Sequence, residues 1–245
     1  MISHSDKCIF IHIPKVAGQS IETFFLRRNG LSWEQRAPLL LRPKMTLDPA
    51  AAPGRLAHLR AADYVNLRYV SEELYNSYFK FAFVRNPYSR IVSFYKYLGY
   101  ENRCNFEYFT KVELKKLLEN PDKGYFVFPQ WTFLYIADIS FSASECLVDY
   151  VGRFETLDND FSYVLKQLGI PDQNLPYVNQ SNEMPRSKGT KVKNILYRLM
   201  KWQFKRRRKI ISWKNVYTPK AKDMVNQIYK KDFEIFGYSE FLDGI

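Results

Sequence analysis

Residues suited to metal centres or disulfide frameworks are scarce in this chain. Its 245 residues include only three cysteines and three histidines. Cys8, Cys104 and Cys146 are widely separated and form no CxxC pair, so we expect reduced thiols in a cytoplasmic protein rather than a disulfide scaffold. Because cysteines and histidines do not cluster, no metal site is expected.

Long hydrophobic runs are also missing. No apolar stretch approaches the roughly 18 residues that span a bilayer, and the first residues lead almost directly into a predicted strand. We therefore expect neither a transmembrane helix nor a signal peptide. Hydrophobic residues still make up 46% of the chain and aromatic residues 17%, which argues against disorder. The length suits a single α/β domain over residues 1–245, without a linker or an internal repeat.

Acidic residues are absent from one long segment. Between Glu183 and Asp223 there is none, whereas fourteen of the 37 lysines and arginines lie there. The net charge of +12 therefore belongs to this acid-free stretch, residues 186–222. Apolar residues interleave with its cations over 191–214, and three roles stay open: a groove for an anionic glycan, peripheral contact with an acidic inner membrane face, or a solvated lid helix.

Two segments, residues 8–25 and 79–95, share one pattern. Each begins with an apolar run typical of a strand in a parallel sheet covered by helices. Each then passes a loop with a cation, Lys15 or Arg85, and continues with apolar residues at helical spacing. Such units direct helix N-termini, backbone N–H groups and cations to one place, which predicts a ligand with two phosphate-like groups.

The remaining pattern completes an α/β chain. A proline-rich excursion over 36–55 precedes His58, and a third strand is predicted at 146–151. Helical spacing and start signals predict helices that begin near 17–18 and 86–87 and others over 107–118, 128–139, 157–168, 192–202 and 219–233.

The first loop can act as an anion cradle although GxxxxGK[ST] is absent. Lys15 stands just past the strand end, Gly18 lets the backbone approach an anion, and Ser20 offers a hydroxyl in the first helical turn. A solvated lysine at a helix start is the alternative interpretation of Lys15.

In the second unit, Arg85 marks the strand end, and Arg90 and Ser93 are three residues apart on one helix face. Arg85 could instead pair with a buried carboxylate. Two cationic loops at parallel positions favour the anion-binding interpretation over these alternatives.

These residues resemble the sulfotransferase superfamily, on the branch of Golgi carbohydrate O-sulfotransferases and their bacterial relatives. Pro14-Lys15-Val16-Ala17-Gly18-Gln19-Ser20 resembles its 5′-phosphosulfate loop, usually PKTAGTS. Arg85-Asn86-Pro87-Tyr88-Ser89-Arg90, with Ser93, resembles its 3′-phosphate motif. Other elements similar to the family's follow in order: Phe128-Pro129-Gln130-Trp131, Val148–Glu155, Tyr217-Thr218-Pro219, Asp232-Phe233 and Phe236-Gly237-Tyr238.

The resemblance implies a P-loop-type fold with a central parallel β-sheet flanked by helices, which binds 3′-phosphoadenosine 5′-phosphosulfate (PAPS) as the sulfate donor without a metal. The residues implied to hold the 5′-phosphosulfate are Lys15, Ala17, Gly18, Gln19 and Ser20. Those implied to hold or approach the 3′-phosphate side are Arg85, Ser93, Arg90 and Arg153, while Arg186 and Lys188 lie on a loop expected to close over the donor. Val16 and Gln19 replace hydroxyl residues of the usual motif, so altered donor affinity is expected.

The implied reaction moves the sulfuryl group to a hydroxyl of an acceptor, a carbohydrate or glycan that is anionic or neutral, or a glycolipid. Lys15 would stabilise the leaving oxygen, and His58 resembles the family's catalytic histidine and would act as the base. A surface histidine is the alternative for His58. Glu22 is the alternative base, or else a solvated helix-face glutamate, and His12 is expected to be a hydrogen-bonded core histidine.

Two other classes of function stay open. A nucleotide-dependent P-loop-like kinase should carry a Walker A lysine and an acidic Mg²⁺ ligand, and neither is evident. A non-enzymatic polyanion-binding protein would explain residues 186–222 but not Lys15 and Arg85 at two aligned loops, so no specific nucleic acid partner is expected. The sequence indicates neither the acceptor's identity nor the oligomeric state.

Overall fold

A four-stranded, mostly parallel sheet forms the centre of the protein. The computed structural model describes residues 1–41, 56–120, 124–137, 143–176, 178 and 213–240. The strand order is β1-β2-β3-β6, where β1 pairs with β2 antiparallel and the other two pairs are parallel. These strands are β1 (Ile2–Ser3), β2 (Cys8–Ile11), β3 (Phe79–Val84) and β6 (Tyr150–Arg153).

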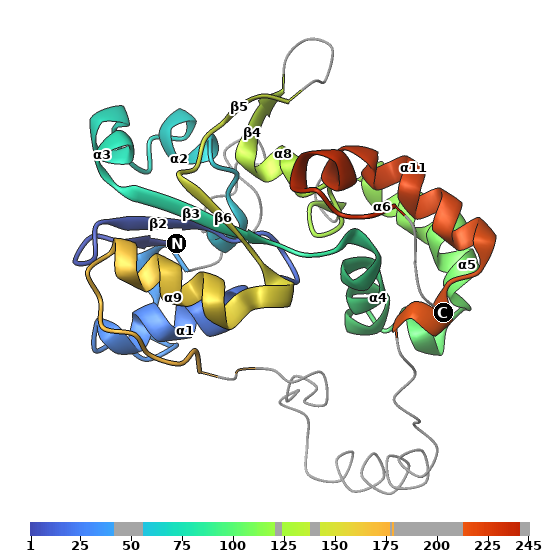
Figure 1. Cartoon of the computed structure of the whole chain (residues 1–245), viewed down its shortest axis with the longest axis horizontal. Helices are drawn as coiled ribbons and strands as arrows, with labels where there is room; N and C mark the ends of the chain where they lie inside the picture. The colour runs from blue at the N-terminus through green and yellow to red at the C-terminus, as the bar shows by residue number, and fades with distance from the viewer. Residues whose placement is uncertain (42–55, 121–123, 138–142, 177, 179–212, 241–245) are drawn as a thin grey trace, which may run out of the picture.

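Helices cover both faces of this sheet, which explains why β2 is apolar throughout and β3 is apolar except at Lys80. In Figure 1, α1 (Gly18–Arg28) and α9 (Leu157–Gln167) lie together on one side, with α2 (Asp63–Asn66) and α3 (Glu72–Ser77) on the other. Phe24 of α1 and Phe161 of α9 make an edge-to-face contact at 5.0 Å between ring centroids. The mixed α/β sheet flanked by helices confirms the predicted fold class, while its P-loop-type details stay a prediction.

A second hydrophobic cluster lies beside the sheet, where α4 and α11 pack together (Figure 1). Its elements are α4 (Pro87–Tyr97), the 3-10 turn η4 (Tyr100–Asn102), α5 (Phe106–Tyr108), the π-helical turn η5 (Phe109–Glu113), α6 (Leu114–Leu118), η7 (Trp213–Val216) and α11 (Pro219–Phe236). Tyr88, Phe94 and Phe109 pack there with Tyr229 and Phe233, all of them buried. This packing anchors the chain's last described helix to the helix that follows Arg85.

Most predicted elements are confirmed, but two boundaries are wrong. The helix expected over 128–139 is limited to α8 (Trp131–Leu134), because the chain then enters β4 (Tyr135–Ala137), which pairs with β5 (Ala143–Cys146). The strand expected over 146–151 is divided between β5 and β6. Asp149 interrupts it, since its carboxylate accepts the Lys80 backbone N–H and pairs with Lys80 Nζ.

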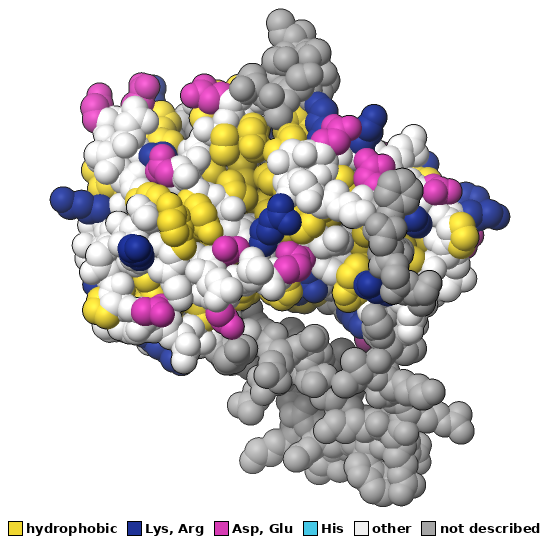
Figure 2. Space-filling model, in the orientation of Figure 1, with side chains coloured by type: hydrophobic (Ala, Val, Ile, Leu, Met, Phe, Trp, Pro, Cys, Tyr) yellow, Lys and Arg dark blue, Asp and Glu magenta, His cyan; other side chains and the backbone are white. Residues whose placement is uncertain are grey.

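The acid-free stretch is described only over residues 213–222, so the helix predicted at 192–202 lies outside the described residues. On the face shown in Figure 2, the lysine and arginine side chains of the described residues are interspersed with acidic ones. Along the part of the chain that the structure describes, no helix combines the length and apolar character that crossing a membrane requires. The single-domain boundary of 1–245 stays a prediction.

Candidate active site

The first loop leaves β2 at Ile11 and enters α1 at Gly18 through an unusual backbone. Lys15 and Ala17 both have positive φ, 73° and 66°, in the left-handed region. Non-glycine residues there cost about 1–3 kcal/mol each and cluster at ligand-binding loops. Alternation of this kind turns successive N–H groups toward one concavity, the geometry of an anion-binding nest. The predicted cradle is therefore a defined loop with a strained backbone.

Gly18 is required by packing against a histidine. A Cβ atom at this position would lie 2.0 Å from His12 Nε2, which no side chain can tolerate. Access of an anion to the backbone is thus one reason for a glycine at position 18. The second reason is that the His12 ring lies directly against the loop.

The second unit places Arg85 directly after β3 and before α4. Asn86 caps α4, and its side chain accepts from the backbone N–H groups of Tyr88 and Ser89 at 3.0 and 3.4 Å. The Arg85 guanidinium donates from Nε to Ser89 Oγ at 2.9 Å and from Nη1 to the Lys15 carbonyl at 3.3 Å. The two predicted cationic loops thus touch each other.

Lys15 and Arg85 form a pair of like charges in a partly buried place. Burial, followed by the positive charge of Arg85, lowers the pKa of Lys15 to about 8. Burial also lowers the pKa of Arg85 to about 10, against the opposing effect of Glu155. No salt bridge among the described residues includes Lys15 or Arg85. The alternative interpretation, in which Arg85 pairs with a buried carboxylate, therefore finds no support there.

Aromatic rings accompany both cations. Lys15 Nζ lies 4.1 Å from the centroid of the Tyr97 ring, and Arg85 Cζ lies 4.1 Å from that of Phe154. Cation–π contacts of this kind hold a cation without neutralising its charge. The arrangement fits an anionic group, since such a group would relieve the repulsion between the two cations.

The other residues implied to bind the 5′-phosphosulfate surround the start of α1. Ala17 is half-buried, Gln19 is exposed and Ser20 is buried. Ser20 Oγ accepts a hydrogen bond from the backbone N–H of Val178 at 3.4 Å. The chain that follows α9 therefore returns to the start of α1, next to the first loop, just before the acid-free stretch. Arg186 and Lys188, expected to reach the donor, lie outside the described residues.

The side chain of Arg90 is bonded to the protein's own backbone. It is fully buried, and its three nitrogens donate to the carbonyls of Pro14, Phe128 and Phe126 at 3.1, 3.0 and 3.0 Å. Arg90 thus connects the first loop to the segment before α8. Ser93, one turn further along α4, is half-buried.

Arg153 is more exposed and contacts the C-terminal helix. Its Nη2 donates to the Phe236 carbonyl at 2.6 Å, and its Cζ lies 4.8 Å from the Tyr238 ring centroid. Neighbouring Glu155 accepts from the backbone N–H of Asn86 at 2.8 Å, beside Arg85. Arg153 therefore flanks the Arg85 region through Tyr238 and Glu155, since the Tyr238 hydroxyl donates to Glu155 at 2.8 Å.

The three residues considered in the search for a catalytic base, His12, Glu22 and His58, lie close together beside the first loop. His12 Nδ1 lies 2.5 Å from Glu22 Oε1, and both side chains are buried, so Glu22 is not on a solvated helix face. The His12 and His58 rings lie 4.4 Å apart between centroids. His58 is 7% exposed, and its Nδ1 bonds to the carbonyl of His12 at 2.9 Å. His12 is thus the hydrogen-bonded core histidine that was predicted, and His58 is not a surface residue.

Two buried polar residues were given no role by the sequence reasoning. Gln130 and Asp232 are both fully buried and hydrogen-bonded to each other. The Gln130 side chain contacts the backbone of Arg85. Both residues lie in segments that resemble the family, so the motifs marked them without showing what they do.

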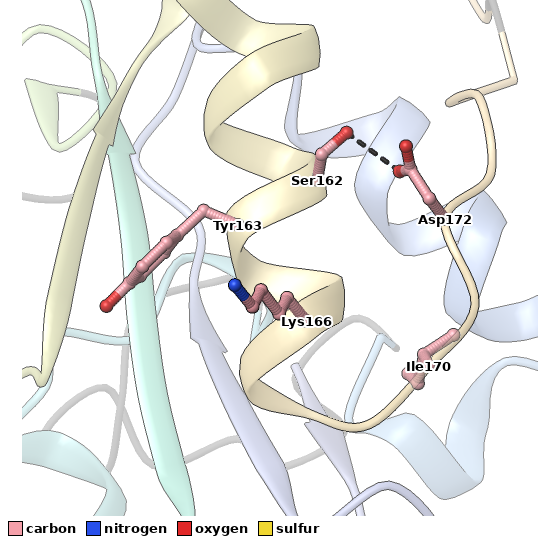
Figure 3. A pocket seen from close by; sticks show the side chains of 5 residues that line it. All are labelled: Ser162, Tyr163, Lys166, Ile170 and Asp172. Atoms are coloured by element: carbon pink, nitrogen blue, oxygen red, sulfur yellow. Dashed lines mark hydrogen bonds between the residues drawn. The ribbon is translucent and has the colours of Figure 1, made fainter.

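The hollow drawn in Figure 3 lies elsewhere. It has a volume of about 430 Å³ and is lined by Ser162, Tyr163, Lys166, Ile170 and Asp172, on α9 and the chain that follows it. Its one drawn hydrogen bond runs from Ser162 to Asp172 at 2.7 Å. None of the predicted site residues lines it, so the candidate active site is defined by the two loops. Within the described residues, no group of three or more histidine, cysteine or acidic side chains lies close enough to hold a metal ion.

Comparison with known proteins agrees with the two loops. The model of the Sulfotransferase family matches residues 1–239. Because this match covers nearly the whole chain, the protein belongs to the sulfotransferase family and is a sulfotransferase. Members of this family generally use PAPS as the donor.

One curated relative and no solved structure accompany that match. A protein of Archaeoglobus fulgidus, named "Uncharacterized protein", is 27% identical over 105 residues, which cover 42% of this chain and 78% of that protein. No solved structure matches the chain. The family assignment therefore rests on the family match together with the site.

Proposed function

We propose that this sulfotransferase moves the sulfuryl group of PAPS to a hydroxyl group of a carbohydrate or glycan acceptor. The observation that carries the proposal is the contact between Lys15 and Arg85 at the ends of neighbouring parallel strands. Two like charges held together, with no ion-pair partner among the described residues, favour a ligand that brings its own negative charges. PAPS has an anionic group at each end of its nucleoside.

Each loop suits one end of this donor. The strained first loop, with the side chains of Lys15 and Ser20, would bind the 5′-phosphosulfate through backbone N–H groups and a cation. Arg85 and Ser93 would bind the 3′-phosphate, because a guanidinium presents several N–H donors to phosphate oxygens. Arg90 would stabilise the first loop rather than contact the donor, since its nitrogens donate to backbone carbonyls.

The transfer needs a stabilised leaving group and a base. A new bond forms between sulfur and the acceptor oxygen while the bond from sulfur to the phosphate oxygen breaks, releasing 3′-phosphoadenosine 5′-phosphate (PAP). The Lys15 ammonium would offset the charge that develops on the leaving oxygen. His58 would take the acceptor's proton: because its Nδ1 donates to a carbonyl, the neutral ring has its lone pair on Nε2.

The contact of the Glu22 carboxylate with His12 favours His58 over Glu22 as the base. The Glu22 carboxylate is 2% exposed and already engaged with His12, so an acceptor hydroxyl has little access to it. His58 contacts the aromatic residues Tyr125 and Phe126 at 5.8 and 5.5 Å between centroids. An apolar sugar face could pack against such rings next to the base.

The acceptor is proposed to bind between residues 36 and 58 and along the acid-free stretch, with 191–214 supplying positive charge for an anionic glycan or for a membrane surface that carries a glycolipid. Binding to anionic vesicles that falls sharply with added salt would support the membrane contact. No binding to such vesicles at low salt would exclude it.

Sulfate transfer from labelled PAPS to a panel of glycans, glycolipids and small alcohols tests the proposed function. We expect labelled product with at least one carbohydrate class, formed about 10²–10³-fold more slowly by Lys15→Ala, a variant whose folding circular dichroism would check. The proposal fails if PAPS is not consumed with any acceptor and PAP does not bind.

A further inference from the structure

A buried chain of hydrogen bonds connects the C-terminal helix to the backbone of Arg85. Asp232, on α11, accepts from the backbone N–H groups of Gln130 and Trp131, both at 2.9 Å. It also accepts from Gln130 Nε2 at 3.4 Å. The Gln130 side chain in turn accepts from the Arg85 N–H at 2.9 Å and donates to the Arg85 carbonyl at 2.8 Å.

The Gln130 amide continues the sheet by one residue. The pairing of β3 with β2 ends at Ala82, and its pairing with β6 ends at Val84. Arg85 therefore lies beyond both ladders, where its backbone needs other partners. A side-chain amide supplies one acceptor and one donor, as a neighbouring strand would.

The chain of bonds is fully enclosed. Gln130 and Asp232 are both 0% exposed, and burial raises the pKa of Asp232 against the opposing influence of Arg90 and of the N–H groups that it accepts. A buried carboxylate stays in a fold only when it is hydrogen-bonded in this way. The amide orientation of Gln130 is consequently fixed from both sides.

We propose that Gln130, held by Asp232, is a positioning residue that fixes the backbone of Arg85 so that its guanidinium meets the 3′-phosphate of the donor. This inference rests on the proposed function, which gives Arg85 that ligand. The guanidinium's own contacts, to Ser89 and to the Lys15 carbonyl, support its orientation from the other end. Gln130 itself does not touch the donor and acts only through Arg85.

A double-mutant cycle with PAP as the probe tests this. In calorimetry, Gln130→Met should weaken PAP binding about tenfold, because one misplaced charged contact is worth about that much. The same change in an Arg85→Ala background should cause no further loss. Binding by Gln130→Met equal to that of the original protein, or an equal loss in both backgrounds, would overturn the proposal.

Two further measurements separate positioning from stability. Lys80→Met removes a partly exposed ion pair with Asp149 at the other end of the same strand and should leave PAP affinity unchanged even where it lowers the melting temperature. Where Gln130→Met does not fold, Asp232→Asn replaces it. This variant should weaken PAP binding when Arg85 is present and should cause no further loss when it is combined with Arg85→Ala.

Hydrogen exchange of the Arg85 amide gives a readout without any ligand. It should be slow in the original protein and accelerate in Gln130→Met, whereas fast exchange in the original protein would contradict the proposal. If PAP fails to bind the original protein while this exchange behaves as expected, the proposed donor is wrong and the positioning of Arg85 stands.

Discussion

Arg85 Nη1 donates to the backbone carbonyl of Lys15 at 3.3 Å. This bond joins two loops that are separated by α1, α2 and α3 in the chain, and it brings two cations into one partly buried place. The strands that lead into the loops are parallel neighbours, so both loops emerge from the same edge of the sheet. One ligand with two anionic groups can therefore contact both cations.

Removing the Lys15 ammonium should remove catalysis while leaving the fold intact. Lys15→Ala should lower kcat by about 10²–10³, the usual cost of losing one electrostatic stabiliser of a transition state. Its melting temperature should not fall, because the cation is desolvated and repelled by Arg85. Turnover within a few-fold of the original would contradict this role, with exposed Lys96→Ala on α4 as the control.

Donor affinity should depend on pH through Lys15. Its pKa of about 8 means that raising the pH from 7 to 9 removes the ammonium, so PAP binding should weaken toward pH 9, by at most about tenfold per pH unit. The folding stability of the free protein should show the opposite trend. Unfolding returns this pKa toward 10.5, so above pH 8 the unfolded chain binds more protons than the folded protein, and folding stability increases as the pH is raised.

Lys15→Arg provides the control for that profile. A guanidinium stays protonated across this range, so the variant's PAP affinity should be nearly constant between pH 7 and 9. Calorimetry of both proteins in the same buffers measures the difference. Parallel profiles would show that another group titrates.

Arg85 should account for recognition of the 3′-phosphate. Arg85→Ala should weaken binding of PAP by about tenfold to a hundredfold, as expected for a charge-assisted contact worth about 1.5–3 kcal/mol. Binding of adenosine 5′-phosphate, which lacks the 3′-phosphate, should hardly change. A similar loss for both nucleotides would mean that Arg85 holds the loop rather than the ligand. Arg103→Ala, which removes an exposed arginine just after η4, is the control.

His58 and Glu22 should separate catalysis from stability. His58→Ala should abolish transfer while PAP binding persists, because the ring acts on the acceptor. Glu22→Gln should instead destabilise the fold by about 1–3 kcal/mol, the cost of leaving a buried partner such as His12 poorly satisfied. Thermal denaturation and turnover of both variants decide the assignment: near-normal turnover of His58→Ala would exclude it as the base.

The sequence predicted the two loops well because their signals are local. Apolar runs at 8–13 and 79–84 are strands with few alternatives, and Asn86-Pro87 has the chemistry of a helix start. The end of the helix predicted over 128–139 failed because pairing of β4 with β5 overrides helical spacing. That partner follows closely in the chain, but its sequence, Ala143–Cys146, lacks the β-branched and aromatic residues typical of a strand.

The inner layer of the site could not be predicted, since burial is a property of the fold. Arg90 was expected to approach the donor and Gln130 was given no role, yet both are fully buried and bonded to backbone atoms beside the two loops. Glu22, considered as an alternative base or as a solvated helix-face glutamate, is buried and paired with His12. Chemistry-bearing residue types thus indicate the region of a site, and tertiary contacts decide which of them face the ligand.

Calorimetric titration with PAP in the absence of Mg²⁺ tests the central proposal most directly, because a kinase-like nucleotide site would require the metal and a general polyanion binder would not distinguish this nucleotide. If Lys15 and Arg85 hold the two ends of one donor, PAP binds with micromolar affinity and Lys15→Ala and Arg85→Ala each weaken it. Absence of binding by the folded protein, or binding that appears only with Mg²⁺, would contradict it.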